Sequence, residues 1–578
     1  MAVFHHLTSS SPWGLPVVLI LLCAGPAPAD SPQIRINSDT TTELQNEQQI
    51  CVNPTDPANF VACWRDFRLG YRQVGIGYSL DGGYSWTDFL LNGPLPWDSD
   101  PVLIVGPDGT FYFAVLNYDP AGGSRLIVHR STTKGVTWEG PFTAVTSTGS
   151  DFEDKEWITI DRTGGARDGT LYLTWSRFGA ARIMCVSSTD RGQIWSYAVQ
   201  VSDGNSCQWP VPAVLGNGDL LIAWNGYTGN TISYDISSDG GATWGADRVM
   251  TYTVAAPGEA INGDILIFPY PCLAVDESDG PRDGWVYCLY ADRLSTYGLD
   301  IWCRRSLDNG VTWSNSVRVN DDPLGPRRDQ FHPWLVCDEQ GILTAIWYDR
   351  RDDPANYRWH IYMSRSLDGG VTWEPNVRVT TVASSPADAL ALAAPETAGG
   401  AQSKAPDLRG SQSRSLGNPR EEAPGISIAP LEFLRAGLIG EYSGVAVRDG
   451  RIHPIWTDTR NGNQDTYTSI LYAPAGIDAR PGPTGLLSLR AFPSPGAGET
   501  LFVLQAARPI EDARVEILDP SGRIVRRIPL GTLNSGETRI PWDGLNGTGA
   551  VQPAGIYLAV ARDPSAAILA RCRSVLLR

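Results

Sequence analysis

Short polar clusters follow several apolar runs in this sequence, and they contain residue types that can do chemistry. Two of them read Trp-Arg-Asp-Phe-Arg at residues 64–68 and Trp-Tyr-Asp-Arg-Arg at residues 347–351. Arginine fixes a carboxylate by paired hydrogen bonds, and a neighbouring carboxylate can act as acid or base. A repeated Asp-x-Arg is more simply an ion-pair network that holds adjacent segments together. The residues of this set are Asp66, Arg68, Asp292, Arg293, Asp349, Arg350, Arg351, Asp458 and Arg460.

A second set of polar residues comes directly before apolar runs: Asp98, Asp100, Glu153, Asp154, Lys155, Glu156, Gln330, His332, Glu441 and Tyr442. The adjacent pair Glu441 and Tyr442 stands out, because a tyrosine activated by a carboxylate can serve as a nucleophile. The alternatives are a structural role and contact with a bound ion. Carboxylate-rich surfaces can hold Ca²⁺, but no calcium-loop motif is present. We therefore expect no cofactor, with structural calcium as the alternative.

The elements that must position these residues follow from a repeat. The pattern Ser-x-Asp-x-Gly-x-Thr-Trp recurs with small variations at residues 79–86, 188–195, 237–244, 306–313 and 366–373, and a sixth copy at 131–138 has Thr133 in place of the aspartate. Ser and Asp side chains bond to backbone groups in tight turns, Gly supplies a positive φ angle, and Trp fills the space between neighbouring sheets. The repeat therefore predicts one hairpin in each blade of a β-propeller, with its aspartates fastening turns rather than doing catalysis.

The number of blades follows from a second count. Seven apolar strands precede polar clusters, against six Ser-Asp-Gly-Trp hairpins, and the seventh unit stops at Tyr472 before a fourth strand. Residues 33–37 (Gln-Ile-Arg-Ile-Asn) resemble residues 316–320 (Ser-Val-Arg-Val-Asn), which are an outer strand by the repeat. An N-terminal strand that completes the last blade would remove an open edge. We predict an all-β chain with a seven-bladed propeller, alternatively a six-bladed one, followed by a small Ig-like β-sandwich.

The order of strands within a blade also predicts where function lies. If strands 1 to 4 run outward, the repeated hairpin joins strands 3 and 4 on one face of the ring. The 2–3 and 4–1 connections then lie on the opposite face, around the central channel. Both sets of polar residues fall on those connections, where functional residues of a rigid scaffold usually lie.

Composition shifts divide the chain into segments. Residues 1–29 contain a short apolar core and end in Ala-Pro-Ala, which predicts a signal peptide and export. The propeller then spans residues 30–475, with a surface insertion rich in Ala, Ser, Gly and Pro at about 384–424. A Pro/Gly linker at 476–485 leads to a C-terminal domain at 486–578. No later segment is apolar and long enough for a transmembrane helix.

The net charge limits which partners the protein can bind, and the cysteine content indicates which cross-links it can form. The formal net charge is −17, and an acidic protein lacks the basic footprint of a nucleic-acid binder. Nine cysteines remain after residue 29, and export permits disulfides. Cys51 with Cys63, and Cys272 with Cys288, flank predicted turns, so two cross-strand disulfides are expected. A metal site is the weaker alternative, because no CxxC motif or histidine cluster accompanies them.

The repeats of residues 33–475 resemble the BNR/Asp-box superfamily, which includes the sialidases. The resemblance implies an exported exo-α-sialidase-like glycosidase that acts on glycans or glycoproteins. It implies that Tyr442 is the nucleophile with Glu441 beside it, and that an acidic residue such as Asp100 or Glu156 is the acid and base. The implied substrate-binding residues are Arg68, Arg293, Arg351 and Arg460. The chain departs from the sialidase Arg-Ile-Pro motif, offering Arg-Ile-Asn at residues 35–37, and the alternative is a non-catalytic surface propeller that binds glycan or protein.

The C-terminal segment carries a second resemblance. Residues 517–522 (Ile-Leu-Asp-Pro-Ser-Gly), 542–549 (Trp-Asp-Gly-Leu-Asn-Gly-Thr-Gly) and 553–557 (Pro-Ala-Gly-Ile-Tyr) resemble the Ig-like domain of flagellar hook-capping proteins. Related modules end many exported bacterial proteins. The resemblance implies a sorting, docking or spacing role at the cell surface or the secretion machinery, without catalysis.

Overall fold

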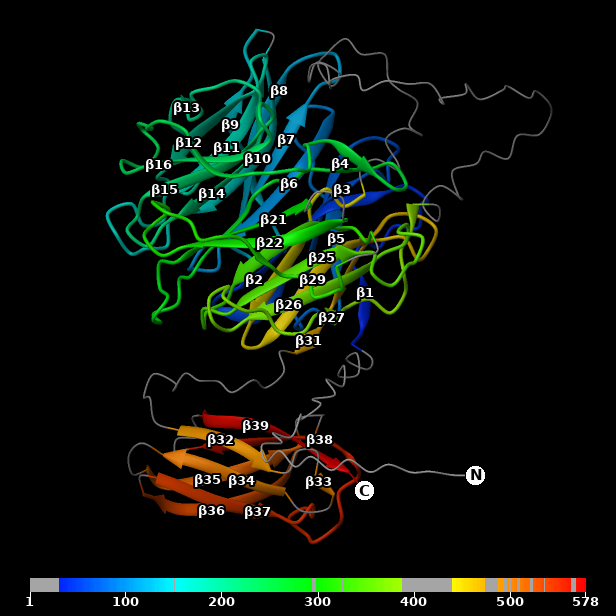
Figure 1. Ribbon diagram of the computed structural model, residues 1–578, viewed down its shortest axis with the longest axis vertical. Coiled ribbons are helices and arrows are strands. Elements are labelled where there is room, and N and C mark those ends of the chain that lie inside the picture. Colours follow the sequence, from blue (N-terminus) through cyan, green and yellow to red (C-terminus); the bar gives the residue numbers. More distant parts are fainter. Residues whose placement is uncertain are drawn as a thin grey trace, which may run out of the picture.

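The computed structural model describes residues 31–149, 151–293, 298–324, 327–386, 439–472, 487–492, 496–497, 500–506, 510–519, 523–534, 536–562 and 568–577. All named elements in these residues are β-strands (Figure 1). The predicted signal peptide, residues 387–424 of the predicted insertion and the predicted linker lie outside the described residues. No helix in the described ranges is both long and apolar enough to cross a membrane.

Residues 31–472 form seven sheets with four main strands each, and consecutive strands pair antiparallel. The first three are β2(Gln45–Asn53)–β3(Asp56–Asp66)–β4(Gln73–Ser79)–β5(Thr87–Leu90), β6(Trp97–Val105)–β7(Phe111–Tyr118)–β8(Ser124–Ser131)–β9(Glu139–Thr146) and β10(Phe152–Ile160)–β11(Leu171–Phe178)–β12(Arg182–Ser188)–β13(Val199–Gln200). The next three are β14(Cys207–Val214)–β15(Leu220–Gly226)–β16(Thr231–Ser237)–β17(Arg248–Tyr252), β20(Cys272–Val275)–β21(Val286–Arg293)–β22(Leu299–Ser306)–β23(Val317–Arg318) and β24(Gln330–Cys337)–β25(Leu343–Asp349)–β26(His360–Ser366)–β27(Val377–Arg378). The last is β28(Gly444–Arg448)–β29(Arg451–Asp458)–β30(Asp465–Ser469)–β1(Gln33–Arg35), with β31(Leu471–Tyr472) also on β29, and a separate hairpin, β18(Glu259–Ile261)–β19(Ile265–Ile267), precedes β20.

The first strands of these sheets form a closed cycle. Each of β2, β6, β10, β14, β20, β24 and β28 contacts the first strand of the next sheet, and β28 contacts β2. Buried apolar side chains fill the space between adjacent sheets, as in the cluster shared by β6 to β12. The first strands therefore surround one axis, and every sheet runs outward from it (Figure 1).

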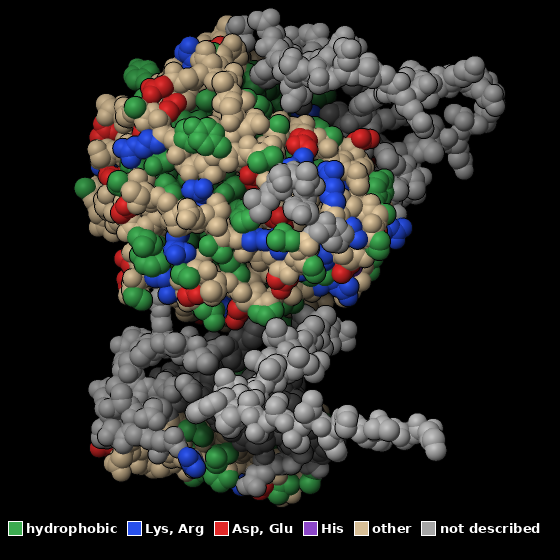
Figure 2. Space-filling model, viewed as in Figure 1, with side chains coloured by type: hydrophobic (Ala, Val, Ile, Leu, Met, Phe, Trp, Pro, Cys, Tyr) green, Lys and Arg blue, Asp and Glu red, His purple; other side chains and the backbone are tan. Residues whose placement is uncertain are grey.

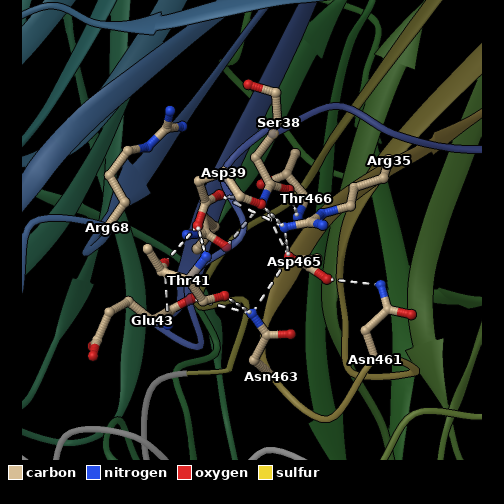
Figure 3. A network of polar contacts seen from close by, with 12 residues as sticks. Arg35, Ser38, Asp39, Thr41, Glu43, Arg68, Asn461, Asn463, Asp465 and Thr466 are labelled. Carbon is tan, nitrogen blue, oxygen red and sulfur yellow. Dashed lines mark hydrogen bonds and ion pairs between the residues drawn. The ribbon is translucent and has the colours of Figure 1, made fainter.

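The N-terminal strand completes the last sheet, as predicted. Gln33 pairs with Ser469 and Arg35 with Tyr467. Beyond the strand, Asn37 Nδ2 donates to Asp465 Oδ1 (3.0 Å) and to Gln45 Oε1 (3.1 Å). Arg35 Nη2 lies 2.8 Å from the same Asp465 carboxylate, and Figure 3 shows these two side chains pointing toward each other.

The same arrangement recurs inside the ring, where the chain is continuous. Asn320 Nδ2 donates to Asp300 Oδ1 (2.8 Å) and to Gln330 Oε1 (3.0 Å), and Arg318 lies 2.6 Å from Asp300. Asn320 follows β23, the fourth strand of its sheet. The strand β1 therefore takes the position of a fourth strand, although it comes from the other end of the chain.

The repeated aspartates fasten the turns between third and fourth strands, as predicted. Asp239 Oδ1 accepts hydrogen bonds from Ala242 N (3.1 Å) and Thr243 N (2.9 Å). Ser237 Oγ accepts from Gly241 N (2.8 Å), which closes the turn. Hydrogen bonds from Thr243 and Ser237 lower the pKa of Asp239 to about 2. These carboxylates are used by their own turns and face solvent, so they take no part in the central site.

The predicted disulfides are wrong, and the sheet register explains why. Cys51 is opposite Val61 while Cys63 is opposite Gln49, so the two cysteines are diagonal neighbours, about 7–8 Å apart in such a pair and too distant for a bridge. Cys272 is opposite Leu289, the neighbour of Cys288. Because side chains alternate along a strand, Cys272 and Cys288 point to opposite faces. All four cysteines are free.

The C-terminal unit contains two sheets that share one apolar core. One is β32(Leu487–Phe492)–β34(Thr500–Ala506)–β37(Gly536–Trp542), and the other is β33(Gly496–Ala497)–β39(Ile568–Leu577)–β38(Gly555–Arg562)–β35(Ile510–Leu518)–β36(Ile524–Leu533). Phe502 and Trp542 from the first sheet join Val515 and Ala559 from the second in this core. Trp542 Nε1 donates to Leu545 O (2.9 Å), so the Trp-Asp-Gly phrase forms a turn anchored by its tryptophan.

Candidate functional site

A recurrent irregularity of the first strands creates the central site. In five sheets the first strand has a β-bulge, in which two of its residues lie opposite one residue of the second strand. In β2 the bulge lies between Asn46 and Gln49, and β6, β10, β14 and β24 have it at the equivalent place. In all five the first bulged residue is not glycine and has a positive φ, from 47° to 63°. Such backbone costs of order 1–3 kcal/mol per residue and is found mainly where a side chain must be aimed.

Each sheet contributes one side chain at the position of the bulge. This residue comes two residues before the point where the first strand resumes its pairing with the second strand. Tyr270 and Tyr442 have this spacing from Cys272 and Gly444, the first paired residues of β20 and β28. We call this set the central ring: Glu47, Asp100, Lys155, Trp209, Tyr270, His332 and Tyr442. Six of the seven are buried, with His332 and Tyr442 each only 1% exposed, and the Lys155 side chain is 12% exposed.

Lys155 is the electrostatic centre of the ring. Its Nζ lies 2.7 Å from Glu441 Oε2, 3.3 Å from Glu47 Oε1 and 3.4 Å from Asp100 Oδ1. The ammonium also stands 4.4 Å from the centroid of the Trp209 ring. Because these groups belong to different sheets, one cation links the first strands of four sheets.

The charges of this cluster depend on burial and on two cations. Burial by itself raises the pKa of a carboxyl group, and it raises the pKa of Glu47 to about 8. For Asp100 and Glu441 burial is outweighed by Lys155 and Arg65, which hold the pKa of both groups below the usual range. Burial opposes the charge of Lys155 too, but the surrounding carboxylates keep its pKa well above normal.

Glu156, the residue after Lys155, is in a different state. It is 1% exposed, and neither of its carboxyl oxygens has a hydrogen-bond partner within the described ranges. Burial, reinforced by the nearby Asp100, raises the pKa of Glu156 well above its ordinary value. Burial and the nearby Asp100 therefore favour the neutral carboxylic acid form of Glu156, whereas Lys155 and Arg65 favour the ionised form of Asp100.

The two carboxyl groups open onto one pocket. Its walls are Asp100, Lys155, Glu156, Trp157, Trp209, Pro210, Val211, Tyr270 and Tyr442. The cavity itself is small, about 10 Å³, which is room for about one water molecule, and the wider space of about 310 Å³ among these side chains includes open solvent. We call this the central pocket; it combines a carboxylic acid, a carboxylate and an ammonium group with apolar walls.

Four of the nine residues in those walls are aromatic. Trp209 stacks on Tyr270 with ring centroids 5.2 Å apart. On another side, Trp157 from β10 meets Trp334 from β24 at 5.1 Å and the edge of Tyr442 at 5.4 Å. Trp157 and Trp334 are only partly buried.

The predicted nucleophile pair is rearranged. Tyr442 and Glu441 both lie at the ring, but the Glu441 carboxylate contacts Lys155 rather than the tyrosine. The carboxylate beside the Tyr442 hydroxyl is that of Glu47, at 3.5 Å, and the hydroxyl also donates to Pro101 O (3.3 Å). Burial, and then Glu47, raise the pKa of Tyr442 well above normal. This hydroxyl therefore stays protonated in the unliganded protein.

The four arginines predicted to bind substrate are each paired with a carboxylate of their own surroundings. Arg68, Arg351 and Arg460 each pair with the aspartate two residues earlier, at 2.6, 2.8 and 2.7 Å. Each also reaches outward to its fourth strand or the residues beside it, namely Asp88, Asn376 and Gln33. Arg293 pairs with Glu259 of the β18–β19 hairpin at 2.5 Å.

The aspartates of these pairs have a second partner. Trp64, Trp347 and Trp456 donate from Nε1 to the same carboxylates, at 2.7–2.8 Å. In β11, Trp175 and Arg177 share Glu153 in the same way. The Asp-x-Arg clusters are therefore Trp–Asp–Arg networks that join the inner and outer strands of a sheet, because each guanidinium is already satisfied by a buried carboxylate.

Sequence reasoning missed three members of the ring: Glu47, Trp209 and Tyr270. A signal for two of them was present, because Asp100, Trp209, Tyr270 and His332 are each followed by proline at the start of an apolar strand. The repeated X-Pro marks the level of the ring. Glu47 is followed by glutamine and carries no such signal. As to metals, the described part of the chain has no group of three His, Cys, Asp or Glu residues arranged to hold an ion.

A closed cycle of four-stranded antiparallel sheets around one axis is the β-propeller fold, and this chain has it, followed by a second all-β unit. Within that unit, residues 492–564 match the family model of the FlgD Ig-like domain. No curated protein matches the chain.

Solved structures resemble the propeller weakly. A protein of unknown function from Dyadobacter fermentans is 17% identical, covering 55% of this chain and 93% of that one, with a TM-score of 0.38. The intramolecular trans-sialidase of Ruminococcus gnavus is 13% identical over 60% and 99%, with a TM-score of 0.42. The GH93 α-L-arabinofuranosidase of Fusarium graminearum is 13% identical over 55% and 92%, with a TM-score of 0.38. Likeness of this degree does not bear on activity.

Proposed function

We propose that this protein is a glycoside hydrolase whose reaction takes place in the central pocket and whose substrate is an uncharged glycan. The observation that carries the proposal is the contrast between two neighbouring carboxyl groups. Glu156 is neutral and without a partner, while Asp100 is held ionised by Lys155. Two carboxyl groups whose surroundings push their pKa values apart are the arrangement that divides acid and base roles in glycosidases.

The roles follow from the protonation states. Glu156 holds the proton that a leaving glycosidic oxygen requires, so it is the general acid. Asp100 supplies the negative charge that either attacks the anomeric carbon or directs a water to it, and that stabilises the positive charge developing on the sugar. Trp157 and Trp209, which line the pocket, would provide apolar surface for a sugar ring. The left-handed backbone of the ring residues supports a site whose side chains are held in place.

The preference for an uncharged sugar follows from the charged side chains around the pocket, whose cations are already paired. An acidic sugar needs cationic groups free to bind its carboxylate. The four arginines proposed from the sequence are paired with carboxylates of their own surroundings. Lys155, the cation of the pocket, is shared by three carboxylates. An anionic sugar would therefore add charge of the same sign as Asp100 and Glu441. This narrows the expected sialidase activity to glycosidase activity on neutral glycans.

We further propose that the seven sheets are the blades of a seven-bladed propeller and that the C-terminal unit is an Ig-like β-sandwich. The cycle of first strands and the core shared by the two C-terminal sheets support this. The protein would be exported and presented at the cell surface through its C-terminal domain. Support comes from the signal-like residues 1–29 and from the FlgD Ig-like match. Basic and acidic side chains alternate on the propeller surface seen in Figure 2, which suits a protein exposed to solvent.

The test is a survey of turnover by the purified protein. Aryl pyranosides and furanosides of neutral sugars are assayed beside a fluorogenic sialoside. We expect turnover of at least one neutral glycoside, and a 10²- to 10⁴-fold loss in Glu156→Gln, the range for removal of a general acid. Glu139→Gln, which changes a half-exposed glutamate on β9, is the matched control and should retain activity. Turnover of the sialoside alone, or full activity in Glu156→Gln, would overturn the proposal.

A binding propeller without catalysis is the competing function. It predicts glycan binding on an array with no turnover of any glycoside. Trp157→Ala would then abolish binding, whereas Glu156→Gln would leave it intact.

A further inference from the structure

The backbone around Lys155 separates two adjacent side chains. Lys155 and Glu156 are the two bulged residues of β10, opposite a single residue of β11. Lys155 has a φ of 52°, which turns its side chain into the carboxylates of the ring. Glu156 lines the same pocket, but no ion pair joins its carboxyl group to this ammonium among the described contacts.

The ammonium of Lys155 is surrounded by acidic groups from several elements. Glu47 of β2, Asp100 of β6 and Glu441 before β28 face it directly, at 2.7–3.4 Å. The Lys155 backbone N–H donates to the other oxygen of Asp100 (3.3 Å). Asp154 precedes it on β10 and acts on it electrostatically. The other cation is Arg65 of β3, 2.9 Å from Glu47.

The remaining neighbours carry no charge. Trp209 from β14 covers the ammonium, and the ring of Tyr442 lies 5.7 Å from it. Burial lowers the pKa of His332 to about 4, so this imidazole is neutral at pH 7. Two cations thus face three buried carboxyl groups, and an unpaired charge at such a position is strongly disfavoured.

We propose that Lys155 is the positioning residue that decides which carboxyl groups of the central pocket are charged, holding Asp100 and Glu441 as carboxylates while Glu156, outside its contacts, remains the carboxylic acid. This inference rests on the proposed function for its consequence in catalysis. The division of charge itself does not depend on that function. The β10 bulge makes this division possible, because it places two consecutive residues, Lys155 and Glu156, in one pocket but in different electrostatic surroundings.

The proposal predicts what removal of the charge does. In Lys155→Met the methylene chain and the packing on Trp209 remain, but Asp100 and Glu441 lose their cation. At least one of them then takes up a proton near neutral pH. Catalytically, the acidic limb of the pH profile of kcat/KM moves up by a unit or more, which is a loss of tenfold or more on that limb. Lys155→Arg keeps the charge and should restore most of the wild-type profile.

The first readout is independent of activity. Protonated buried carboxyl groups give an infrared carbonyl band distinct from that of carboxylates, and it is followed from pH 5 to 9. Glu47, whose pKa burial raises to about 8, also contributes to such a band at pH 7. We therefore expect a band at pH 7 in the wild-type protein that is smaller in Glu156→Gln, and a larger band in Lys155→Met. Lys134→Met is the matched control, because Lys134 is half-exposed and pairs with Asp56 at the surface. It should leave the band unchanged.

The outcomes separate the two proposals. An unchanged band in folded Lys155→Met, or no protonated carboxyl band in the wild-type protein at pH 7, overturns the role of Lys155. The wild-type measurement keeps the test decisive even if Lys155→Met does not fold. A changed band in a protein that turns over no glycoside supports the role of Lys155 and overturns the proposed function alone.

Discussion

The closure of the propeller by its N-terminal strand leads to a prediction that two matched side chains can test. Asn37 follows β1 and Asn320 follows β23, and both are buried. Asn37 Nδ2 donates to Asp39, Gln45 and Asp465, while its Oδ1 accepts from Thr466 N. Asn320 makes the same four bonds, to Asp322, Gln330, Asp300 and Ile301 N. The contacts are equal, but β1 alone is joined to its sheet without chain continuity.

The expected loss follows from these bonds. A hydrogen bond to a neutral partner contributes about 1 kcal/mol and one to a charged partner about 1.5–3 kcal/mol. After a change of Asn to Leu, Arg35 and Arg318 still neutralise the aspartates. We therefore use the lower end of each range of hydrogen-bond energies. The amide has two N–H groups for three acceptors, so three bonds are counted, two with aspartates and one neutral. They amount to about 4 kcal/mol in the free energy of unfolding for either variant. For a propeller of roughly 440 residues this corresponds to a fall in Tm of about 4–5 °C.

The two variants should differ in how they open. In Asn37→Leu the strand β1 detaches locally, since hydrogen bonds hold it to β30 and to neighbours such as Val379 and Arg460 but the chain does not connect it to this sheet. In Asn320→Leu the strand stays tethered at both ends. Calorimetry gives the two Tm values, and limited proteolysis at 25 °C with N-terminal sequencing reports detachment of β1. Equal Tm losses with early cleavage near residue 40 in Asn37→Leu alone are expected. A wild-type Tm for Asn37→Leu, or the same early cleavage in both variants, would refute this account of closure.

Two further predictions concern stability. Burial lowers the pKa of His453 to about 3, below the ordinary value of about 6.5, so the unfolded state binds the proton more readily. The free energy of unfolding should then be fully present above pH 6.5 and fall by about 1.4 kcal/mol per pH unit as pH drops toward 3. Urea titrations at pH 7 and 5 should show a smaller difference in His453→Leu than in the wild type, and an equal difference would contradict the assignment. In the hairpin that lacks its aspartate, Thr133 Oγ1 accepts from Thr137 N (2.9 Å), whereas Asp239 accepts from two backbone N–H groups. Thr133→Asp should therefore stabilise the protein by about 1 kcal/mol, seen as a higher urea midpoint, and a lower midpoint would show that the turn has adapted to threonine.

Much of the fold was readable from local patterns. The Ser-Asp-Gly-Trp hairpins placed the turns between third and fourth strands, because their hydrogen bonds lie within a few residues of one another, as at residues 237–243. The likeness of residues 33–37 to 316–320 predicted the last pairing, because the same Arg and Asn contacts are needed at both sites. The disulfides failed because spacing in sequence does not reveal register, and a shift of one residue sends Cys272 and Cys288 to opposite faces.

Only some residues of the candidate site could be predicted from the sequence. Asp100, Glu156, Glu441 and Tyr442 could be named, since polar residues before each first strand must gather at the axis. The partners could not be named, because they come from different sheets. Glu441 turned away from Tyr442 toward Lys155, and Glu47, some 395 residues earlier in the chain, took its place beside the hydroxyl.

The Asp-x-Arg clusters also separate what the sequence determines from what the tertiary structure determines. Their chemistry permitted either a ligand site or an internal network, and the sequence by itself determined only that each arginine has an aspartate two residues away. The tertiary structure decided between the two, because each guanidinium turns outward to its own fourth strand and its neighbours and is satisfied there. Local hydrogen bonds are set by residues close in the chain, so sequence determined the hairpins and the number of repeats. The protonation of the central pocket depends on burial and on charges brought together from several sheets, which only the closed ring provides.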